Sequence, residues 1–323
     1  MLKYVVAAVL AVVFASSALA WEPPSVVKVV VGQSPGGGNE YAMRGVAPVI
    51  EKENPKVSFI IDHKPGLDNV VAMNHFAQQK PNGHTLLVVN QETGFIAAPI
   101  AYKNQLQLDP MNYTFVTTIA KAPLAFIVPI DSPFKTVPQL LAHLKNNQTK
   151  FNIGLSGSVN LLTYSYFTNK LQLSTDRIQS IRYQSPTAAS IAVASKELDM
   201  AIVPISVPRP MVGSKLRILA HTGSRPIPGI EDVALMKDYV DGLEINASWS
   251  VFLPPGTPAN IVKWYADQFQ KALASEQTKE YFSAGWATID TTALGPQGLT
   301  ASISKLKKTW LETARQVLKN ESL

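Results

Sequence analysis

The sequence predicts an α/β protein made of two halves, each with a mostly parallel sheet that helices cover on both faces. Short runs of β-branched residues alternate with stretches whose apolar residues recur at helical spacing, and this alternation restarts after Lys121. Strands that are separated by helices form parallel sheets, because a parallel neighbour can only be reached through a crossover connection. A chain of 323 residues is long enough for two such halves.

The first half begins with a strand, a glycine-rich loop and a helix. Residues 26–31 read VVKVVV and are followed by Gly32, which indicates a buried strand and its end. Residues 40–53 place their apolar side chains on roughly one helical face. We expect two further strands and a helix, at residues 57–61, 84–89 and 70–79 respectively.

The second half repeats the alternation, and two amphipathic helices close the chain. Ser185 followed by Pro186 has the pattern of a helix cap with proline at the first helical position. We expect strands at residues 126–130, 152–155, 178–183, 199–203, 216–220 and 249–253. We expect helices at residues 137–145, 161–171, 188–195, 259–275 and 302–318.

The first twenty residues have the pattern of a secretory signal peptide. Lys3 precedes an apolar run, and Ala18-Leu19-Ala20 forms a small-residue cleavage site before Trp21. The apolar run is shorter than the roughly 20 residues that span a bilayer. A buried N-terminal helix is the alternative, but it would not explain the A-x-A ending. We therefore expect an exported, soluble chain of 303 residues that begins at Trp21.

Charge and cysteine content exclude several classes of protein. Without the signal peptide the chain has 28 Lys and Arg residues against 23 Asp and Glu residues, a small excess without the basic stripe of a nucleic-acid-binding protein. The absence of cysteine excludes thiol nucleophiles, disulfides, thiolate metal sites and lipid attachment after the signal peptide. A domain of this size can be stable without disulfides.

The loop at residues 34–40, SPGGGNE, is a candidate anion-binding loop. Its three glycines allow a ligand to approach the backbone, and the following helix start offers free N–H groups. A carboxylate or a phosphate would suit this loop. It matches neither the P-loop nor the dinucleotide-binding pattern. A tight turn without a ligand is an equally good interpretation of the residues alone.

A second loop, GLSGS at residues 154–158, nearly matches the nucleophile elbow of hydrolases. Ser158 stands where that motif requires a glycine, and the five histidines are scattered. A second helix-entry loop is the better interpretation, although a catalytic triad assembled in space stays open as an alternative. No spacing of histidines or carboxylates indicates a metal site.

Ligands in α/β sheets bind beyond the carboxyl ends of the strands, which selects the candidate ligand-binding residues. They are Ser34, Gly36, Gly37, Gly38, Asn39, Asp68, Asn69, Asn90, Ser156, Gly157, Ser158, Asn160, Tyr183, Ser185 and Thr187. Glu40 and Asp68 either face a ligand or serve as helix-terminal acids. Aromatic residues that either line the site or pack in the core are Tyr41, Phe95, Tyr183 and Trp249.

Four motifs resemble the periplasmic solute receptors of tripartite tricarboxylate transporters, also called the Bug family. The segment from Ser34 to Arg44 is similar to the family's P-P-G-G-x-T-D…R. PNGHTLL at residues 81–87 is similar to P-D-G-Y-T-L-L, LDM at 198–200 to V-D-L-M/A, and FLPPGTP at 252–258 to F-A-P-x-G-T-P. Their order and spacing agree from about residue 26 to the C-terminus.

This resemblance implies a type II-like periplasmic binding protein fold with a cleft between two lobes. One lobe would comprise residues 21–122 and 249–323, the other residues 123–248, with residues 1–20 as the signal peptide. The family implies that backbone amides of the two glycine loops, residues 34–39 and 156–160, grip a carboxylate.

The receptor would deliver a small organic acid to an inner-membrane permease. We expect a monomer without cofactor, metal or enzymatic activity. A secreted hydrolase and a ligand-sensing receptor for a signalling partner are the alternatives.

Three departures from the family pattern concern the site. Asp68 and Asn69 replace two glycines of N-R-P-G-A-G-G-N, residues 183–185 read YQS instead of Y-K-G, and Leu161-Leu162-Thr163 stands where a histidine is usual. An acid that faces the cleft would repel a ligand carboxylate. Asp68 therefore predicts a ligand with an amine, hydroxyl or amide donor, or a mono-acid, unless it caps the helix that starts near Val70.

Overall fold

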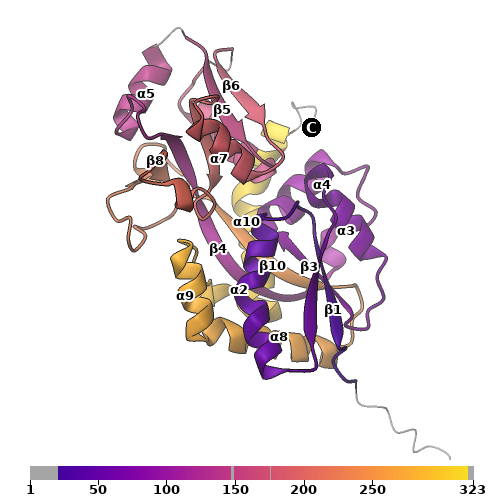
Figure 1. Ribbon diagram of the computed structural model, residues 1–323. Helices are drawn as coiled ribbons and strands as arrows, with labels where there is room; N and C mark the ends of the chain where they lie inside the picture. The colour runs from indigo at the N-terminus through magenta and orange to yellow at the C-terminus, as the bar shows by residue number, and fades with distance from the viewer. Residues whose placement is uncertain (1–20, 147–148, 175, 319–323) are drawn as a thin grey trace, which may run out of the picture.

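A single curled sheet runs through the molecule in the computed structural model, which describes residues 21–146, 149–174 and 176–318. The predicted signal peptide, residues 1–20, lies outside the described residues. Within them the sheet has ten strands, in the order β2-β1-β3-β10-β4-β7-β5-β6, with β8 and β9 attached beside β4. Figure 1 shows two lobes, which we call lobe 1, with β1 and β3, and lobe 2, with β5 and β6; β4 runs through both.

Lobe 1 is built on three parallel strands with crossover helices. These elements are β1 (Val26–Val31), α2 (Gly38–Glu53), β2 (Ser58–His63), α3 (Val70–Ala77) and β3 (Thr85–Asn90). Val29 in the central strand is paired with Ile61 on one side and Leu86 on the other. The strands and helices agree with the prediction to within three residues at each end, because the β-branched runs and the helical periodicity are both strong here.

Lobe 2 repeats the arrangement with a second parallel set. Its elements are α5 (Val137–Asn146), β5 (Phe151–Leu155), α6 (Ser158–Lys170), β6 (Ile178–Arg182), α7 (Pro186–Ala194), β7 (Met200–Pro204), β8 (Leu216–His221) and β9 (Ala234–Leu235). β5 lies between β6 and β7 and is parallel to both. Ser185 caps α7 as predicted, since its Oγ accepts a hydrogen bond from the N–H of Ala188 at 3.1 Å.

The two lobes are joined by β4 (Thr114–Pro129) and β10 (Asn246–Leu253). β4 pairs with β10 up to Pro123 and with β7 and β8 from Leu124 onward. Every antiparallel pair in the sheet involves β4 or β10, so the parallel character of each lobe is kept. Only residues 126–130 were expected to form a strand here, so the prediction missed the part of β4 that belongs to lobe 1.

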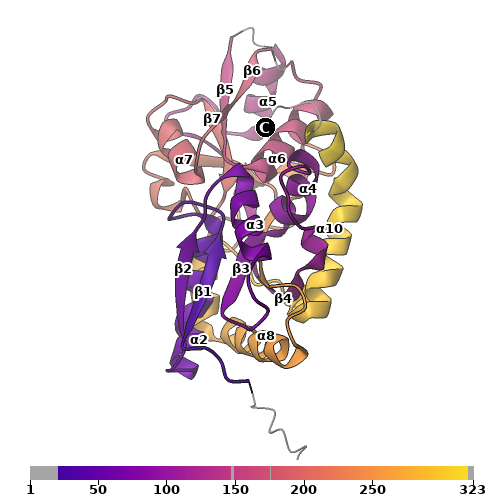
Figure 2. The same ribbon diagram turned by 90° about the vertical axis from the view of Figure 1, so that its right-hand side faces the viewer.

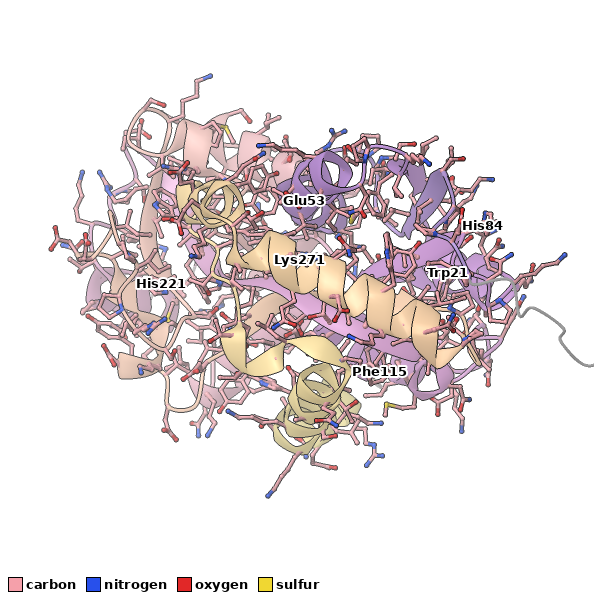
Figure 3. The ribbon with its side chains drawn as sticks, turned by 90° about the horizontal axis from the view of Figure 1, so that it is seen from below. Trp21, Glu53, His84, Phe115, His221 and Lys271 are labelled. Carbon is pink, nitrogen blue, oxygen red and sulfur yellow. The ribbon has the colours of Figure 1, made fainter. Side chains whose placement is uncertain are left out.

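Three helices complete the described chain: α8 (Ala259–Ala274), α9 (Glu276–Ala284) and α10 (Gly295–Leu318). Seen from below, α8 lies across the base of lobe 1 (Figure 3). Figure 2 shows α10 running along the side of both lobes. It contacts β4 and, in lobe 2, α6, where the ring centroids of Trp310 and Tyr166 are 5.3 Å apart.

Short helical turns lie mainly in the connections. They are Leu67–Asn69, the π-helical turn Thr93–Ala97, α4 (Ala98–Ala101), Pro110–Asn112, Arg209–Met211, Met236–Asp238 and Thr291–Ala293. The sequence indicated none of these turns, and it missed α9. One cluster of buried apolar side chains extends from Val29 through Phe126 to Ile153, so the core is continuous between the lobes.

Candidate functional site

The first glycine loop, between β1 and α2, is tightly packed. Gly36 has a φ of +82°, a conformation that residues with a side chain rarely adopt. A Cβ on Gly38 would lie 2.7 Å from Nε1 of Trp249, so only glycine lets the helix start approach β10. The backbone conformation and packing of this loop therefore require glycine at these two positions, whether or not a ligand binds there.

The carboxylate of Glu40, in the first turn of α2, folds back onto this loop. Its Oε2 accepts the N–H of Gly36 at 2.8 Å, and its Oε1 accepts Nε of Arg44 at 2.6 Å. Burial alone would raise the pKa of Glu40, but the Gly36 N–H, Arg44 and His63 outweigh it and hold the pKa below its usual value. Glu40 therefore lies at the site as a charged, locally neutralised group.

The segment between β2 and α3 has an unusual backbone. Leu67, Asp68 and Asn69 have φ values of 44°, 50° and 77°, three left-handed residues in succession. Such a conformation costs about 1–2 kcal/mol for an ordinary residue and less for Asp and Asn. Glycine would adopt this backbone without strain, and Asp and Asn tolerate it better than most other residues. This explains why Asp68 and Asn69 can stand where the family pattern has glycines.

Asn69 connects this segment to the first glycine loop. Its Oδ1 accepts Nδ2 of Asn39 at 2.9 Å, and both side chains are buried. A Cβ on Gly32 would lie 2.5 Å from Cα of Asn69, so the two segments of lobe 1 lie in direct backbone contact. Two of the candidate residues, Asn39 and Asn69, are therefore brought together.

Asp68 reaches into the other lobe. Its Oδ2 accepts the N–H of Ser158 at 3.0 Å, at the first turn of α6. The Asp68 carboxylate thus caps the N-terminus of α6 and not that of α3. The N-cap residue of α3 is Asn69, and its side chain makes no capping hydrogen bond. Burial raises the pKa of Asp68, although the bonds to Ser158 and the charge of Arg182 partly counteract it.

A second contact between the lobes lies beside the first. Ser158 Oγ donates to Oγ1 of Thr93 at 3.4 Å, and the N–H of Thr93 donates to Oδ1 of Asn90 at 3.1 Å. Thr93 begins the π-helical turn after β3, an irregularity often found at functional sites. Asn90, Asp68 and Ser158 therefore belong to one group of contacts at the junction of the lobes.

Glu92 is a buried acid that the sequence did not single out. Its two carboxylate oxygens accept the N–H and the Oγ–H of Ser248 in β10, at 2.9 and 2.8 Å. Burial raises its pKa to about 7, against the bonds from Ser248 and the charge of Lys121. Lys121 is itself paired with Asp290 at 2.7 Å. Only its position, two residues after the end of a buried strand, could have indicated Glu92.

Two buried polar atoms of these loops have no hydrogen-bond partner in the part of the chain that the structure describes. They are Oδ1 of Asn39 and Oγ of Ser156; Oη of Tyr41 is likewise without a partner there, but it lies against Gly285 after α9. Buried polar groups without a partner are rare and destabilising. A ligand with hydrogen-bonding groups would satisfy such atoms.

Several other candidate residues form hydrogen bonds within lobe 2. Nδ2 of Asn160 donates to the carbonyl of Ile202, and Oη of Tyr183 donates to Glu197 at 2.7 Å. Ser185 caps its helix, and Thr187 is exposed. Their role at a ligand site stays a prediction. Phe95 and Trp249 are at most 2% exposed, which shows that both pack in the core.

Among the described residues, Ser156 has none of the hydrogen-bonded neighbours that a nucleophilic serine requires. Its Oγ has no hydrogen-bond partner among the described residues, whereas such a serine needs an adjacent base. His221 is buried, and its Nδ1 accepts the N–H of Gly223 at 3.1 Å; burial lowers its pKa to about 4. His84 and His221 lie on opposite sides of the molecule (Figure 3).

The described part of the chain contains neither a group of metal-binding side chains nor a membrane-spanning helix. Within residues 21–146, 149–174 and 176–318, no three His, Cys, Asp or Glu side chains are grouped so that they could hold a metal ion. Over the same ranges, no helix has the length and apolar character needed to cross a membrane.

Comparison with known sequences identifies a receptor family. The family model described as "Tripartite tricarboxylate transporter family receptor" matches residues 44–301. A UPF0065 protein of Bordetella pertussis is 27% identical over 266 residues, which cover 80% of this chain and 79% of the relative. A UPF0065 protein of Cupriavidus necator is 24% identical over 263 residues, with coverages of 80% and 77%.

Solved structures share the fold. A Rhodopseudomonas palustris protein solved with adipate has a TM-score of 0.84 at 20% identity, over 92% of this chain and 98% of that chain. MatC of the same species, with bound malate, has a TM-score of 0.79 at 20% identity, over 90% and 98%. The periplasmic binding protein BugD has a TM-score of 0.81 at 21% identity, over 90% and 97%. These similarities confirm the predicted two-lobed α/β binding-protein fold.

Proposed function

The chain belongs to the tripartite tricarboxylate transporter receptor family, and on that premise we propose that it binds a small organic carboxylate between its lobes. Members of such a family present their ligand to a membrane permease, which would be the partner of this chain. Neighbours solved with malate and adipate support a carboxylate as the class of ligand. We expect the receptor to release its ligand chemically unchanged.

One observation carries the proposal: two strand-to-helix loops, one from each lobe, meet at the junction of the lobes. Asp68 and Thr93 of lobe 1 contact Ser158 of lobe 2 directly. The unpartnered Oγ of Ser156 belongs to the loop that carries Ser158, and the unpartnered Oδ1 of Asn39 belongs to the first glycine loop, which Asn39 joins to the Asp68 segment through its bond to Asn69. A ligand held here touches both lobes, which is the condition under which binding favours a closed form.

The boundaries and the cellular location are part of the proposal. Lobe 1 would comprise residues 21–122 and 249–323, and lobe 2 residues 123–248; the change of β4 pairing between Pro123 and Leu124 supports the first crossover. Residues 1–20 would direct the chain to the periplasm. The working form would be a monomer, and the candidate residues from Ser34 to Thr187 would line the ligand.

A hydrolase is the less favoured function. The matching family is described as a receptor family, and Oγ of Ser156 has no hydrogen-bond partner in the described structure. We propose that the chain performs no covalent chemistry. Assays with ester and amide substrates test this directly, because turnover that is lost in Ser156→Ala would contradict the receptor proposal.

A thermal-unfolding screen of organic acids tests the binding proposal. A ligand at 100 times its Kd stabilises the native state by about 2.7 kcal/mol, which raises the Tm by several degrees. We expect at least one small carboxylate to raise the Tm in a concentration-dependent way, while its amide or methyl ester does not. A broad panel of mono-, di- and tricarboxylates without any such shift would contradict the proposed function.

A further inference from the structure

A carboxylate of lobe 1 already occupies the helix N-terminus that lobe 2 contributes to the site. Asp68 Oδ2 accepts the N–H of Ser158, and its Oδ1 lies 3.2 Å from the place that a Cβ on Gly157 would take. Ser158 opens the 13-residue helix α6 and is 2% exposed. An anion is favoured at the N-terminus of such a helix, and here the protein supplies that anion itself.

The carboxylate is held in this place by its backbone neighbours. Leu67, Asp68 and Asn69 keep a left-handed conformation, which a chain retains only where surrounding contacts enforce it. Asn69 supplies those contacts through its bond to Asn39 and its close packing on Gly32. Asp68 is therefore fixed toward Ser158 and is not a freely moving surface acid.

We propose that Asp68 replaces a ligand carboxylate in lobe 2, so that this receptor accepts acids with one carboxylate and rejects dicarboxylates. The inference rests on the proposed carboxylate-receptor function and names the subclass of ligand. It makes Asp68 a specificity-determining residue.

The physical reason is competition for one donor and repulsion of like charges. A second ligand carboxylate at this end of the site would need the Ser158 N–H that Asp68 already uses, and it would lie beside the Asp68 carboxyl group in a partly buried space. Burial raises the pKa of Asp68, and the bonds to Ser158 and the charge of Arg182 act against that shift. A second carboxylate beside Asp68 would compete for the Ser158 N–H in either protonation state, and it would also be repelled wherever Asp68 is ionised. A specific site commonly excludes the wrong ligand by such an unfavourable pairing.

The same arrangement favours a donor at the far end of the ligand. A hydroxyl or amide group can donate to the Asp68 carboxylate, and Oδ1 of Asn39 is a buried acceptor without a partner among the described residues. The preferred ligand is therefore a monocarboxylate that carries an O–H or N–H group.

Two matched pairs of acids test the inference by isothermal titration. Adipate is compared with hexanoate, and malate with 2-hydroxybutyrate; in each pair one carboxylate is exchanged for a methyl group. The proteins are wild type, Asp68→Gly, which suits the left-handed backbone, and Asp68→Asn, which keeps the shape and removes the charge. Asp267→Asn removes a half-exposed acid of α8 and serves as the matched control.

We expect wild type to favour the monocarboxylate of each pair, and both Asp68 variants to shift the preference toward the dicarboxylate by about tenfold or more. Asp267→Asn keeps the wild-type preference. Circular dichroism and thermal unfolding confirm that the variants are folded. The inference is overturned if neither Asp68 variant gains affinity for adipate or malate relative to its partner acid, whatever wild type binds. The proposed function fails separately, through the absence of any ligand in the broad acid screen.

Discussion

The two glycine loops at the junction of the lobes have the same local design but obtain their carboxylate differently. In lobe 1, Gly36 of the loop donates to Glu40, four residues further along the chain in the first turn of α2. In lobe 2, Ser158 donates to Asp68, which is 90 residues away and belongs to the other lobe. The first contact can form within a single folded lobe, whereas the second exists only while the lobes touch. One carboxylate contact of the site therefore depends only on the local structure of lobe 1, and the other depends on the association of the two lobes.

The two carboxylates also differ in their electrostatics. Glu40 has Arg44 and His63 beside it, and its pKa is lowered despite burial. For Asp68, burial outweighs the Ser158 bonds and Arg182, and its pKa is raised. Ionised Glu40 thus stabilises the fold, while ionised Asp68 is tolerated at a cost. This contrast indicates that Asp68 is kept for recognition, whereas Glu40 is explained by stability.

The largest effect is expected within the first loop. Gly38→Val places a side chain against Trp249, whose ring packs on that of Tyr41 at 5.7 Å, and should destabilise the protein by about 3 kcal/mol. Gly36→Ala meets no atom within 4 Å and should cost only about 1 kcal/mol through its positive φ. Urea unfolding measures both. Equal effects of the two substitutions would show that the loop is not closely packed on β10.

Glu40→Gln should have a smaller effect with a defined pH dependence. Loss of charge-assisted bonds to Gly36 and Arg44 is expected to cost about 1–2 kcal/mol at pH 7. Because the pKa of Glu40 is lowered in the folded state, the advantage of wild type is complete above pH 4.5 and decreases as the pH falls through the folded-state pKa. Denaturant unfolding between pH 3 and 7 measures it. An advantage that grows toward low pH contradicts this account.

Asp68→Asn should change stability least, with the opposite dependence on pH. Because the pKa of Asp68 is raised, wild type loses stability relative to the variant as the pH rises above 3.8, until the folded-state pKa is passed. The total change is expected to be about 1 kcal/mol. The same unfolding series, run on both variants, compares the two carboxylates directly. Parallel pH curves for Glu40→Gln and Asp68→Asn would remove the distinction between the loops.

How far the sequence predicts the site depends on the distance over which each contact acts. Both loops were predicted, because glycines and hydroxyl residues follow strands and precede helices. The role of Asp68 was left between a cap for its own helix and a residue that faces the ligand. The structure shows a third role, a cap for the helix of the other lobe. Capping patterns describe residues within one turn, so no local pattern could identify a partner 90 residues away.

The fold was predicted well where an element lies entirely within one lobe and packs against one set of neighbours. β1 and α2 have such uniform surroundings, and their periodicity is clear. β4 passes through both lobes and changes partners at Pro123, a residue that would normally argue against a strand interior. Glu92 was missed for a related reason: its partner Ser248 lies in β10, and only the crossing of the chain between lobes brings them together.

The central claim is that one carboxylate ligand contacts both loops at once. Hydrogen exchange measured by mass spectrometry tests it most directly, with the acid that raises the Tm most in the screen. Amides in peptides that cover residues 32–41 and 154–162 should exchange more slowly when ligand is bound, while α5, in the outer part of lobe 2, should not change. Protection of only one of the two loops, or of neither, would contradict binding between the lobes.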